Sequence, residues 1–251
     1  MYQDLHSHTY YSFCGVDNPE DVVKAAISGG LQVIGINDHN YGIGFGDWSV
    51  FLIQTEECRT TYGRALKKYF DHINLIKELY KDQITVLRGI EVCTLNDYGR
   101  LLPENEDISY FDYCLVENLS DIGRTTLNND LFSFVKRAKC KVGVAHTDMF
   151  SFIEHIGEDP LEYFTKMANL GVFWEMNVNY DSTHNYHEHA YVKEFFSNKE
   201  QQEIIRKSGV EISIGFDGHN IEDYLPERIK DFCDKLEELK IPFAFSKELK
   251  L

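Results

Sequence analysis

The sequence predicts an α/β fold in which βα units surround a parallel sheet, and three observations support this prediction. Short apolar runs alternate with segments of helical periodicity along the whole chain. At 251 residues with 43% apolar content, the chain can bury one full core, and α/β barrels often reach this length. Acidic and imidazole side chains follow several of the apolar runs, and parallel barrels carry their chemistry at such strand ends. We therefore interpret residues 1–251 as one domain.

The first half of the chain is expected to begin with a strand from Tyr2 to Leu5 and a well-defined helix. Asn18 can cap that helix, Pro19 suits its first position, and acidic residues follow in its first turn. Gly29 and its neighbouring glycine end it. The elements expected next are a strand over Val33 to Asn37, a glycine-rich loop over Asn40 to Asp47, a helical region over Thr55 to Lys81, a strand over Ile84 to Ile90 and an irregular insertion over 92–111.

The second half is expected to continue the alternation without an internal repeat, a linker or a low-complexity tract. The expected strands cover Tyr113 to Val116, Val142 to Ala145, Val172 to Asn177 and Glu211 to Gly215. The expected helices lie near Asn129 to Lys139, Leu161 to Leu170, Lys199 to Lys207 and Pro226 to Leu239.

The charge balance narrows the range of partners. With 41 acidic against 25 basic residues, the net charge is −16, which argues against binding long nucleic acid. A small anionic substrate remains compatible, because bound cations reverse the local field. No window is apolar enough to cross a bilayer, no export leader precedes the first strand, and the six cysteines show no CxxC pairing. We expect a cytoplasmic protein with reduced thiols and no membrane partner.

The strongest functional indication is a set of metal-binding side chains at the ends of the expected strands. His6 and His8 lie two positions apart, so on a strand both face the same side and form a chelating pair. Asp217 and His219 flank a glycine, which lets the chain turn and present both to one point. Taken alone, the histidine pair could equally be two partly exposed side chains.

Three further strand ends carry weaker indications. The Asp38-His39 step is common in loops, and a glutamate such as Glu91 after a strand often only caps a helix. A lone histidine such as His146 is more often hydrogen-bonded in a core. Because accidents at five strand ends of one chain would be improbable, we predict one convergent site for Zn, Mn or Fe, which imidazole and carboxylate ligands suit.

The same motifs resemble those of the PHP (polymerase and histidinol phosphatase) family. HSHT with a following CG, then NDH, GIE, AHTD and FDGH occur in the order of that family, from residue 6 to residue 219. The resemblance implies a distorted TIM-like (β/α)7 barrel, two to three divalent metal ions (Zn, Mn or Fe) and phosphoester hydrolysis. The histidinol-phosphatase-like branch is closest in length and layout.

The resemblance also implies how the ligands are shared among three metal positions. The first metal would be surrounded by His6, His8, Glu91 and Asp217. A second metal would be held by Glu91, which bridges to it, and by His146. A third metal would be held by His39 and His219.

Two positions depart from the family pattern. Cys14 stands where His or Asp is usual, and Leu119 stands where His is usual, with Glu117 and Asn118 beside it. Cys14 could serve as a thiolate ligand, which would favour zinc over manganese, or it could be a simple thiol. Because Leu119 replaces the usual His, the second metal would need Glu117, Asn118 or Asp148 as a substitute ligand.

The function implied by the resemblance is hydrolysis of a small phosphate monoester by a metal-activated water. His6, His8, Glu91 and Asp217 would act through that water. Arg124, in the loop after the fourth expected strand, is our candidate for binding the phosphate. Glu175 and Asn177 are expected to hydrogen-bond to the ligating histidines. The histidine-rich stretch after them faces either substrate or solvent, and its histidines are His184, His187 and His189.

Three alternatives stay open at this point. The chain could be a phosphodiesterase that acts on a small nucleotide. It could be an amidohydrolase barrel, which also uses HxH but usually needs a bridging carbamylated lysine, and no lysine stands at an expected strand end. It could also be a PHP relative that binds metal without catalysis, because a fold does not imply a function. The pattern indicates neither the substrate nor the oligomeric state.

Overall fold

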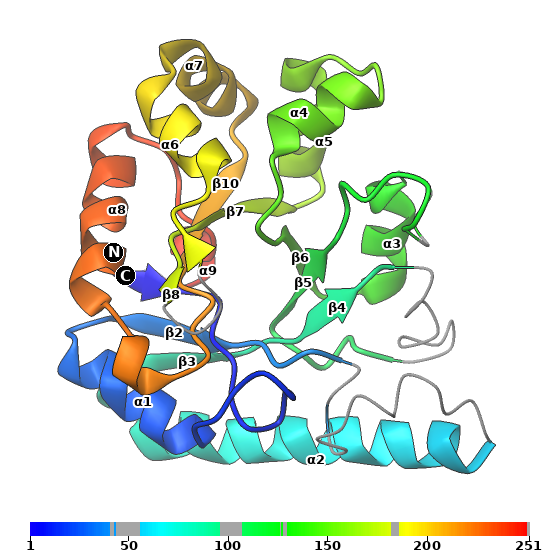
Figure 1. Ribbon diagram of the computed structural model, residues 1–251, viewed down its shortest axis with the longest axis vertical. Helices are drawn as coiled ribbons and strands as arrows, with labels where there is room; N and C mark the ends of the chain where they lie inside the picture. The colour runs from blue at the N-terminus through cyan, green and yellow to red at the C-terminus, as the bar shows by residue number, and fades with distance from the viewer. Residues whose placement is uncertain are drawn as a thin grey trace.

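The computed structural model describes residues 1–40, 43, 56–95, 107–125, 127, 130–181 and 186–249, and side chains within these ranges except at 56–63, 180, 181, 186 and 187. Most of the expected glycine-rich loop and much of the expected insertion lie outside the described residues. Within them, most of the parallel strands are followed by one or two α-helices (Figure 1).

Parallel strands make up the centre of the molecule. They are β1 (Gln3–Asp4), β2 (Val33–Ile36), β3 (Thr85–Arg88), β4 (Glu91–Cys93), β5 (Tyr113–Glu117), β6 (Lys141–Val144), β7 (Phe173–Asn177) and β10 (Glu211–Gly215). One sheet has the order β1-β2-β3 and the other the order β10-β7-β6-β5-β4. Every pairing in the two sheets is parallel.

The two sheets join at both of their edges. Leu5 N donates to Ile214 O at 2.8 Å, which connects β1 to β10. At the other seam β3 and β4 are two parts of one interrupted strand: Gly89 N donates to Ile36 O at 2.9 Å, and Leu115 N donates to Ile90 O at 2.9 Å. With β3 and β4 counted as one, seven parallel strands enclose the centre. This arrangement confirms the predicted distorted (β/α)7 barrel.

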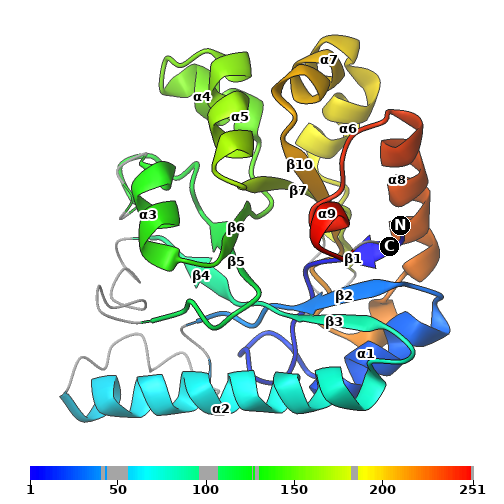
Figure 2. The same cartoon turned by 180° about the vertical axis from the view of Figure 1, so that it is seen from behind.

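Helices cover the outside of this barrel. They are α1 (Pro19–Ser28), α2 (Glu56–Tyr80), α3 (Leu131–Ala138), α4 (Met149–His155), α5 (Pro160–Asn169), α6 (Ala190–Ser197), α7 (Lys199–Ser208), α8 (Pro226–Glu238), the short α9 (Ser246–Leu249) and the 3-10 turn η2 (Ile221–Asp223). The long α2 runs beneath β2 and β3 in both views (Figures 1 and 2). No described helix combines the length and the apolarity that spanning a bilayer requires.

Local sequence explains most helix starts. Asn18 accepts a hydrogen bond from Asp21 N at 2.9 Å and Pro19 follows it, so α1 begins as predicted. The helix expected near Asn129 begins at Leu131, because the side chain of Asp130 accepts from Ser133 N and caps it there. Helices α4 and α6 and a small antiparallel hairpin were not predicted. The hairpin consists of β8 (Tyr180–Asp181) and β9 (Tyr186–His187).

The strand expected over Ile84 to Ile90 is split into β3 and β4. A Cβ on Gly89 would lie 2.1 Å from Asn37 Nδ2, so only glycine lets the backbone come this close to β2. Beyond this point the chain pairs with β5, while Glu91 keeps one isolated bridge to His39, just after β2. The split therefore moves Glu91 from a strand end to the first position of β4.

The apolar core has two layers. The larger layer lies between the strands and the helices. A smaller cluster fills the inside of the barrel and consists of Leu5, Val33, Leu87, Tyr113, Leu115, Ala145, Phe173, Ala244 and Phe245. Most of its strand members lie at or before the middle of their strands, and Ala244 and Phe245 come from the C-terminal segment. The apolar filling thus occupies the N-terminal end of the barrel and leaves the C-terminal end to polar side chains.

Candidate metal centre

Seven polar side chains meet at the C-terminal end of the barrel, and we call them the strand-end cluster. The cluster consists of His6, His8, His39, Glu91, His146, Asp217 and His219. They follow β1, β2, β6 and β10, or begin β4. All of them belong to the predicted set of ligands, so the topology brings together side chains that the sequence separates by up to about 210 residues.

One group within the cluster surrounds His8. The Nε2 atom of His8 lies 3.2 Å from His6 Nε2 and 3.0 Å from Asp217 Oδ1. The distance from His6 Nε2 to the same Asp217 oxygen is 3.6 Å. All three side chains are buried, and their nitrogen and oxygen atoms are close enough together to hold one cation.

Glu91 occupies the centre of the cluster. Its Oε1 atom lies 3.1 Å from His146 Nε2 and 3.4 Å from His6 Nε2. Its Oε2 atom lies 2.9 Å from His39 Nδ1 and 3.5 Å from His8 Nε2. One carboxylate that faces four imidazoles through both oxygens has the geometry of a bridging ligand.

Backbone strain accompanies the strand ends. His146 has a φ of 23° and Asp217 a φ of 55°, both in the left-handed region. Asp217 N donates to His6 O at 2.6 Å, so the end of β10 is tied to the end of β1. Non-glycine residues in this region cost of order 1–3 kcal/mol each and tend to occur at functional sites.

Glu175, which points inward from β7, holds two members of the cluster. Its Oε1 atom lies 2.7 Å from His6 Nδ1, and its Oε2 atom accepts from His146 N at 2.7 Å. Asn177 Nδ2 donates to Asp217 Oδ2 at 3.3 Å. The hydrogen bonds expected between Glu175 and the histidines are therefore present, whereas Asn177 bonds to the carboxylate of Asp217 and not to a histidine. Both residues orient members of the cluster from behind.

Asp38 holds the loop after β1 in place. Its carboxylate accepts from Thr9 N at 2.8 Å and Thr9 Oγ1 at 2.7 Å, and from Ser12 N at 3.0 Å and Ser12 Oγ at 2.7 Å. Ser12 Oγ in turn accepts from His39 N at 2.8 Å. Thr9 and Ser12 were not predicted to matter, and their only indication in the sequence is that two hydroxyl residues follow HSH.

The electrostatics of the cluster match a site for cations. Burial alone would lower the pKa of His6, but Glu175, Glu91 and Asp217 raise it well above its ordinary value. Burial alone would also lower the pKa of His146, but the hydrogen bond to Glu91 raises it to about 9. The pKa values of Glu91 and Asp217 fall well below their ordinary values despite burial, because imidazoles surround both carboxylates. In the chain alone, bound protons provide the positive charge that divalent cations could provide instead.

Cys14 lies beside the cluster. Its Sγ atom forms a group of metal-binding size with nitrogen atoms of His8 and His39. Burial raises the pKa of Cys14, but hydrogen bonds with His219 and His39 lower it below its ordinary value overall. The other cysteines with described side chains are free thiols, which are Cys93, Cys114, Cys140 and Cys233.

The remaining candidates lie around the cluster. Arg124 is exposed in the turn after β5, next to Thr125, which pairs with Leu95 just beyond β4. This places Arg124 at the same end of the barrel as the cluster. His184 lies outside the described residues, as does the side chain of His187. His189 is partly buried at the start of α6, and burial together with His146 lowers its pKa.

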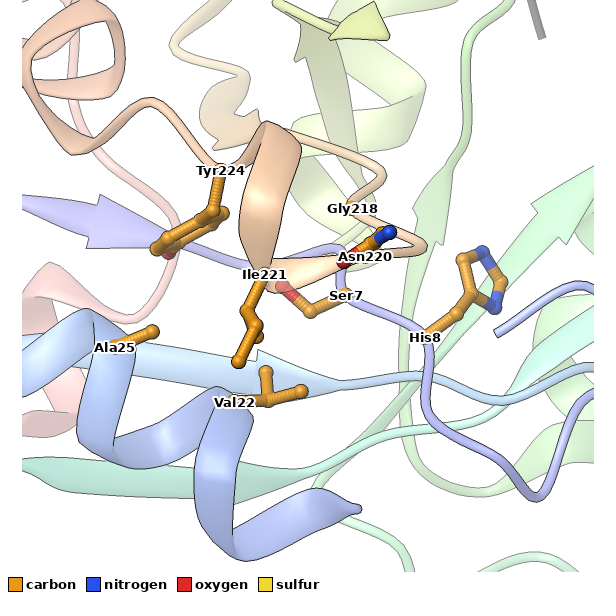
Figure 3. A pocket seen from close by; sticks show the side chains of 8 residues that line it. All are labelled: Ser7, His8, Val22, Ala25, Gly218, Asn220, Ile221 and Tyr224. Atoms are coloured by element: carbon orange, nitrogen blue, oxygen red, sulfur yellow. The ribbon is translucent and has the colours of Figure 1, made fainter. Parts of the chain in front are cut away.

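A small cavity lies behind His8, between α1 and η2. Its lining residues are Ser7, His8, Val22, Ala25, Gly218, Asn220, Ile221 and Tyr224. Figure 3 shows the ring of His8 directed away from Val22 and Ile221. With about 10 Å³ of space, the cavity is large enough for one water molecule and too small for a substrate.

Comparison with known proteins identifies the family of this chain. The PHP domain family matches residues 4–244. The crystal structure of histidinol phosphate phosphatase from Lactococcus lactis, complexed with zinc, L-histidinol and phosphate, is 18% identical and has a TM-score of 0.57, over 95% of this chain and 93% of that one. At this identity the likeness shows a shared fold. No curated protein sequence matches this chain significantly.

Two further solved structures are similar at lower TM-scores. A candidate histidinol phosphatase from Listeria monocytogenes is 17% identical over 96% of this chain and 93% of that one, with a TM-score of 0.39. A chain of an archaeal ribonuclease P with mature tRNA is 14% identical over 94% of this chain and 89% of that one, with a TM-score of 0.44. The family match covers almost the whole barrel and every member of the strand-end cluster, and the chain belongs to the PHP domain family.

Proposed function

We propose that this protein is a metal-dependent phosphoesterase that hydrolyses a small phosphate monoester, in the manner of histidinol phosphatases. The observation that carries the proposal is the strand-end cluster itself. Two buried carboxylates and five imidazoles meet at the end of the barrel where substrates bind in this type of fold. The zinc, histidinol and phosphate bound by the Lactococcus lactis protein support the same reaction class for a chain of this family.

The proposed ligands are those that the sequence indicates. The set comprises His6, His8, His39, Glu91, His146, Asp217, His219 and Cys14. When bound, divalent cations supply an activated water and stabilise charge on the transferred phosphoryl group. His6, His8, Glu91 and Asp217 would hold the cation that supplies that water.

The residues of the chain prepare this chemistry before any substrate binds. Glu175 accepts from His6 Nδ1, so Nε2 is the ring nitrogen of His6 that faces the cluster and can bind a metal once its proton is displaced. The backbone at His146 and Asp217 is left-handed, and their side chains contact Glu91 and His8 of the cluster. Arg124 is proposed to bind the phosphate from the turn after β5. We further propose that the chain acts as a single domain in the cytoplasm.

The proposal is tested with the full chain before and after metal stripping. Turnover of p-nitrophenyl phosphate is measured after Mn²⁺, Zn²⁺ or Fe²⁺ is restored, in the wild type, in His8→Ala and in the control His155→Ala. His155 is exposed at the end of α4, away from the cluster. Turnover that requires metal, survives His155→Ala and is lost in His8→Ala supports the proposal. Activity that persists without metal and in His8→Ala contradicts it.

The same assay separates the alternatives. Faster turnover of bis-p-nitrophenyl phosphate than of the monoester would indicate a phosphodiesterase for small nucleotides. Metal binding without turnover of either ester would indicate a PHP domain that has lost catalysis.

A further inference from the structure

We propose that Glu117 is a metal ligand and that, with His39 and Glu91, it forms a carboxylate-rich metal position of its own. Glu117 is the last residue of β5, two positions before Leu119. The proposal rests on the metal-binding part of the proposed function and extends the ligand set that the family motifs indicate.

The first argument is the geometry of the three side chains. Glu117 Oε1 lies 3.5 Å from His39 Nδ1, and His39 Nδ1 lies 2.9 Å from Glu91 Oε2. The three atoms form a group small enough to share one cation. The side chains of Glu117, His39 and Glu91 are 10%, 11% and 1% exposed, so the position lies inside the barrel rather than on its rim.

The second argument concerns hydrogen bonding, and it is independent of the first. Glu117 Oε1 and Glu91 Oε2 are both buried, and His39 Nδ1, which lies 3.5 Å from the first and 2.9 Å from the second, is not aligned to hydrogen-bond to either. A buried carboxylate oxygen without a donor is costly, and native structures rarely leave one uncompensated. Two such oxygens that face the same imidazole are explained by a cation between them.

The other residues that could replace a ligand at Leu119 are engaged elsewhere. Leu119 itself is fully buried in the outer apolar layer. Asn118 Oδ1 accepts from Cys93 Sγ at 3.4 Å. The carboxylate of Asp148 caps α4, where it accepts from Ser151 N at 3.0 Å and Ser151 Oγ at 2.7 Å. Of the three candidates that the sequence left open, Glu117 is the one whose side-chain oxygen lies close to the cluster, at 3.5 Å from His39 Nδ1.

The donor set indicates which metal this position would prefer. Two carboxylates and one imidazole form an oxygen-rich site, which suits Mn²⁺ better than a thiolate site does. The group of His8, Cys14 and His39 contains sulfur and nitrogen and suits Zn²⁺. We therefore expect manganese to bind at Glu117 and zinc to compete best beside Cys14.

The test is a Mn²⁺ titration of the metal-stripped full chain, followed by the electron paramagnetic resonance signal of free Mn²⁺. We expect Glu117→Gln to lose one class of Mn²⁺ site or to weaken it at least about tenfold. The matched control is Asp148→Asn, which removes the carboxylate that caps α4 and should keep the wild-type number of sites. Equal numbers and affinities of Mn²⁺ sites in Glu117→Gln and wild type would overturn the proposal.

Two further measurements keep the result interpretable. Metal-stripped Glu117→Gln should have a Tm at least as high as that of the metal-stripped wild type, because the substitution removes a buried carboxylate oxygen that has no hydrogen-bond donor. Glu117→His should restore the lost site with a preference for Zn²⁺ over Mn²⁺. If Glu117→Gln loses a metal while the wild type hydrolyses no phosphoester, the ligand assignment stands and only the proposed function fails.

Discussion

His6 and Glu175 lie 169 residues apart in the chain, and their side chains meet at 2.7 Å between Nδ1 and Oε1. The other oxygen of the same carboxylate accepts from His146 N at 2.7 Å. Glu175 therefore links the ends of β1 and β6 from its place on β7. A neutral histidine that donates through one ring nitrogen has a lone pair on the other, so this carboxylate determines which ring nitrogen of His6 can bind metal.

Replacing Glu175 with glutamine tests this relationship. Glu175→Gln keeps the size of the side chain but weakens its acceptance of the hydrogen bond from His6. We expect metal affinity to fall about 10–100-fold, as for other carboxylates behind ligating histidines, while the circular dichroism spectrum stays unchanged. Titration with Zn²⁺ and Mn²⁺ measures the loss, and Glu194→Gln on the exposed side of α6 is the control. An unchanged affinity would show that His6 is oriented without Glu175.

The approach of Glu175 to His6 depends on a glycine in β10. A Cβ on Gly215 would lie 2.0 Å from Glu175 Oε1 and 2.7 Å from His6 Cβ. Gly215→Ala should push Glu175 aside, weaken metal binding and destabilise the fold by about 1–3 kcal/mol.

Gly218→Ala is the matched control. Contrary to the expectation from the sequence, Gly218 does not have a positive φ, so the turn between Asp217 and His219 does not require glycine, and the nearest atom to its Cβ would be Phe216 Cδ1 at 3.3 Å. Thermal unfolding and metal titration of both variants check this prediction. Equal effects of the two substitutions would contradict it.

The sequence predicts the cluster residues at the strand ends better than the hydrogen bonds that support them. His6, Asp217 and their partners could be identified because each follows an apolar run, and parallel strands place such residues at one end of a sheet. The supporting role of Thr9 and Ser12 could not be predicted, because their hydrogen bonds to Asp38 exist only once β1 and β2 pair.

The unpredicted helices have a similar explanation. Helix α4 has 7 residues, too few to give a clear periodic pattern, and its start depends on the side chain of Asp148. The break between β3 and β4 depends on contact between Gly89 and Asn37, which belong to different strands. The choice of Glu117 over its neighbours required the distance to His39, which no pattern of residues along the chain contains.

Metal binding should depend on pH because the cluster holds protons that a metal must displace. The pKa of His146 is raised to about 9 and that of His6 lies well above its ordinary value, so at pH 7 both are protonated in the metal-free chain. Ligating histidines are neutral, so binding releases these protons. Metal affinity should therefore rise with pH up to about 9, by about tenfold per pH unit for each proton released.

Isothermal titration calorimetry in two buffers of different ionisation enthalpy counts the protons released. We expect about two protons per chain at pH 7 from these histidines. Binding that releases no proton would mean that neither histidine becomes a neutral ligand.

An ion pair outside the cluster should make folding stability depend on pH. Asp112 accepts from Arg88 Nε at 2.9 Å, Arg88 Nη2 at 2.6 Å and Arg88 N at 2.8 Å, and Lys77 Nζ lies 3.3 Å away. Burial would raise the pKa of Asp112, but the bonds from Arg88 hold it below its ordinary value. A depressed folded-state pKa gives stability that is complete above the unfolded value of about 3.9 and is lost as pH falls through the folded value.

Asp112→Asn should therefore lower the free energy of unfolding by about 1–2 kcal/mol at pH 7, with a smaller difference from wild type below pH 4. Urea unfolding at both pH values measures the difference. A constant difference across this range would show that the charge of Asp112 is not its source.

Cys14 provides the most direct test of which metal the cluster selects. A thiolate beside two imidazoles favours zinc, and Mn²⁺ gains little from sulfur, so Cys14→Ser should weaken Zn²⁺ binding at least about tenfold and leave Mn²⁺ binding unchanged. Cobalt substitution reports the ligand itself, because a thiolate bound to Co²⁺ absorbs in the near ultraviolet and a hydroxyl does not. The wild type and the control Cys140→Ser should both show this absorption, since Cys140 precedes β6 at the opposite end of that strand from His146. If Cys14→Ser keeps the absorption, or the wild type lacks it, Cys14 is a thiol beside the site and the preference for zinc must come from the histidines.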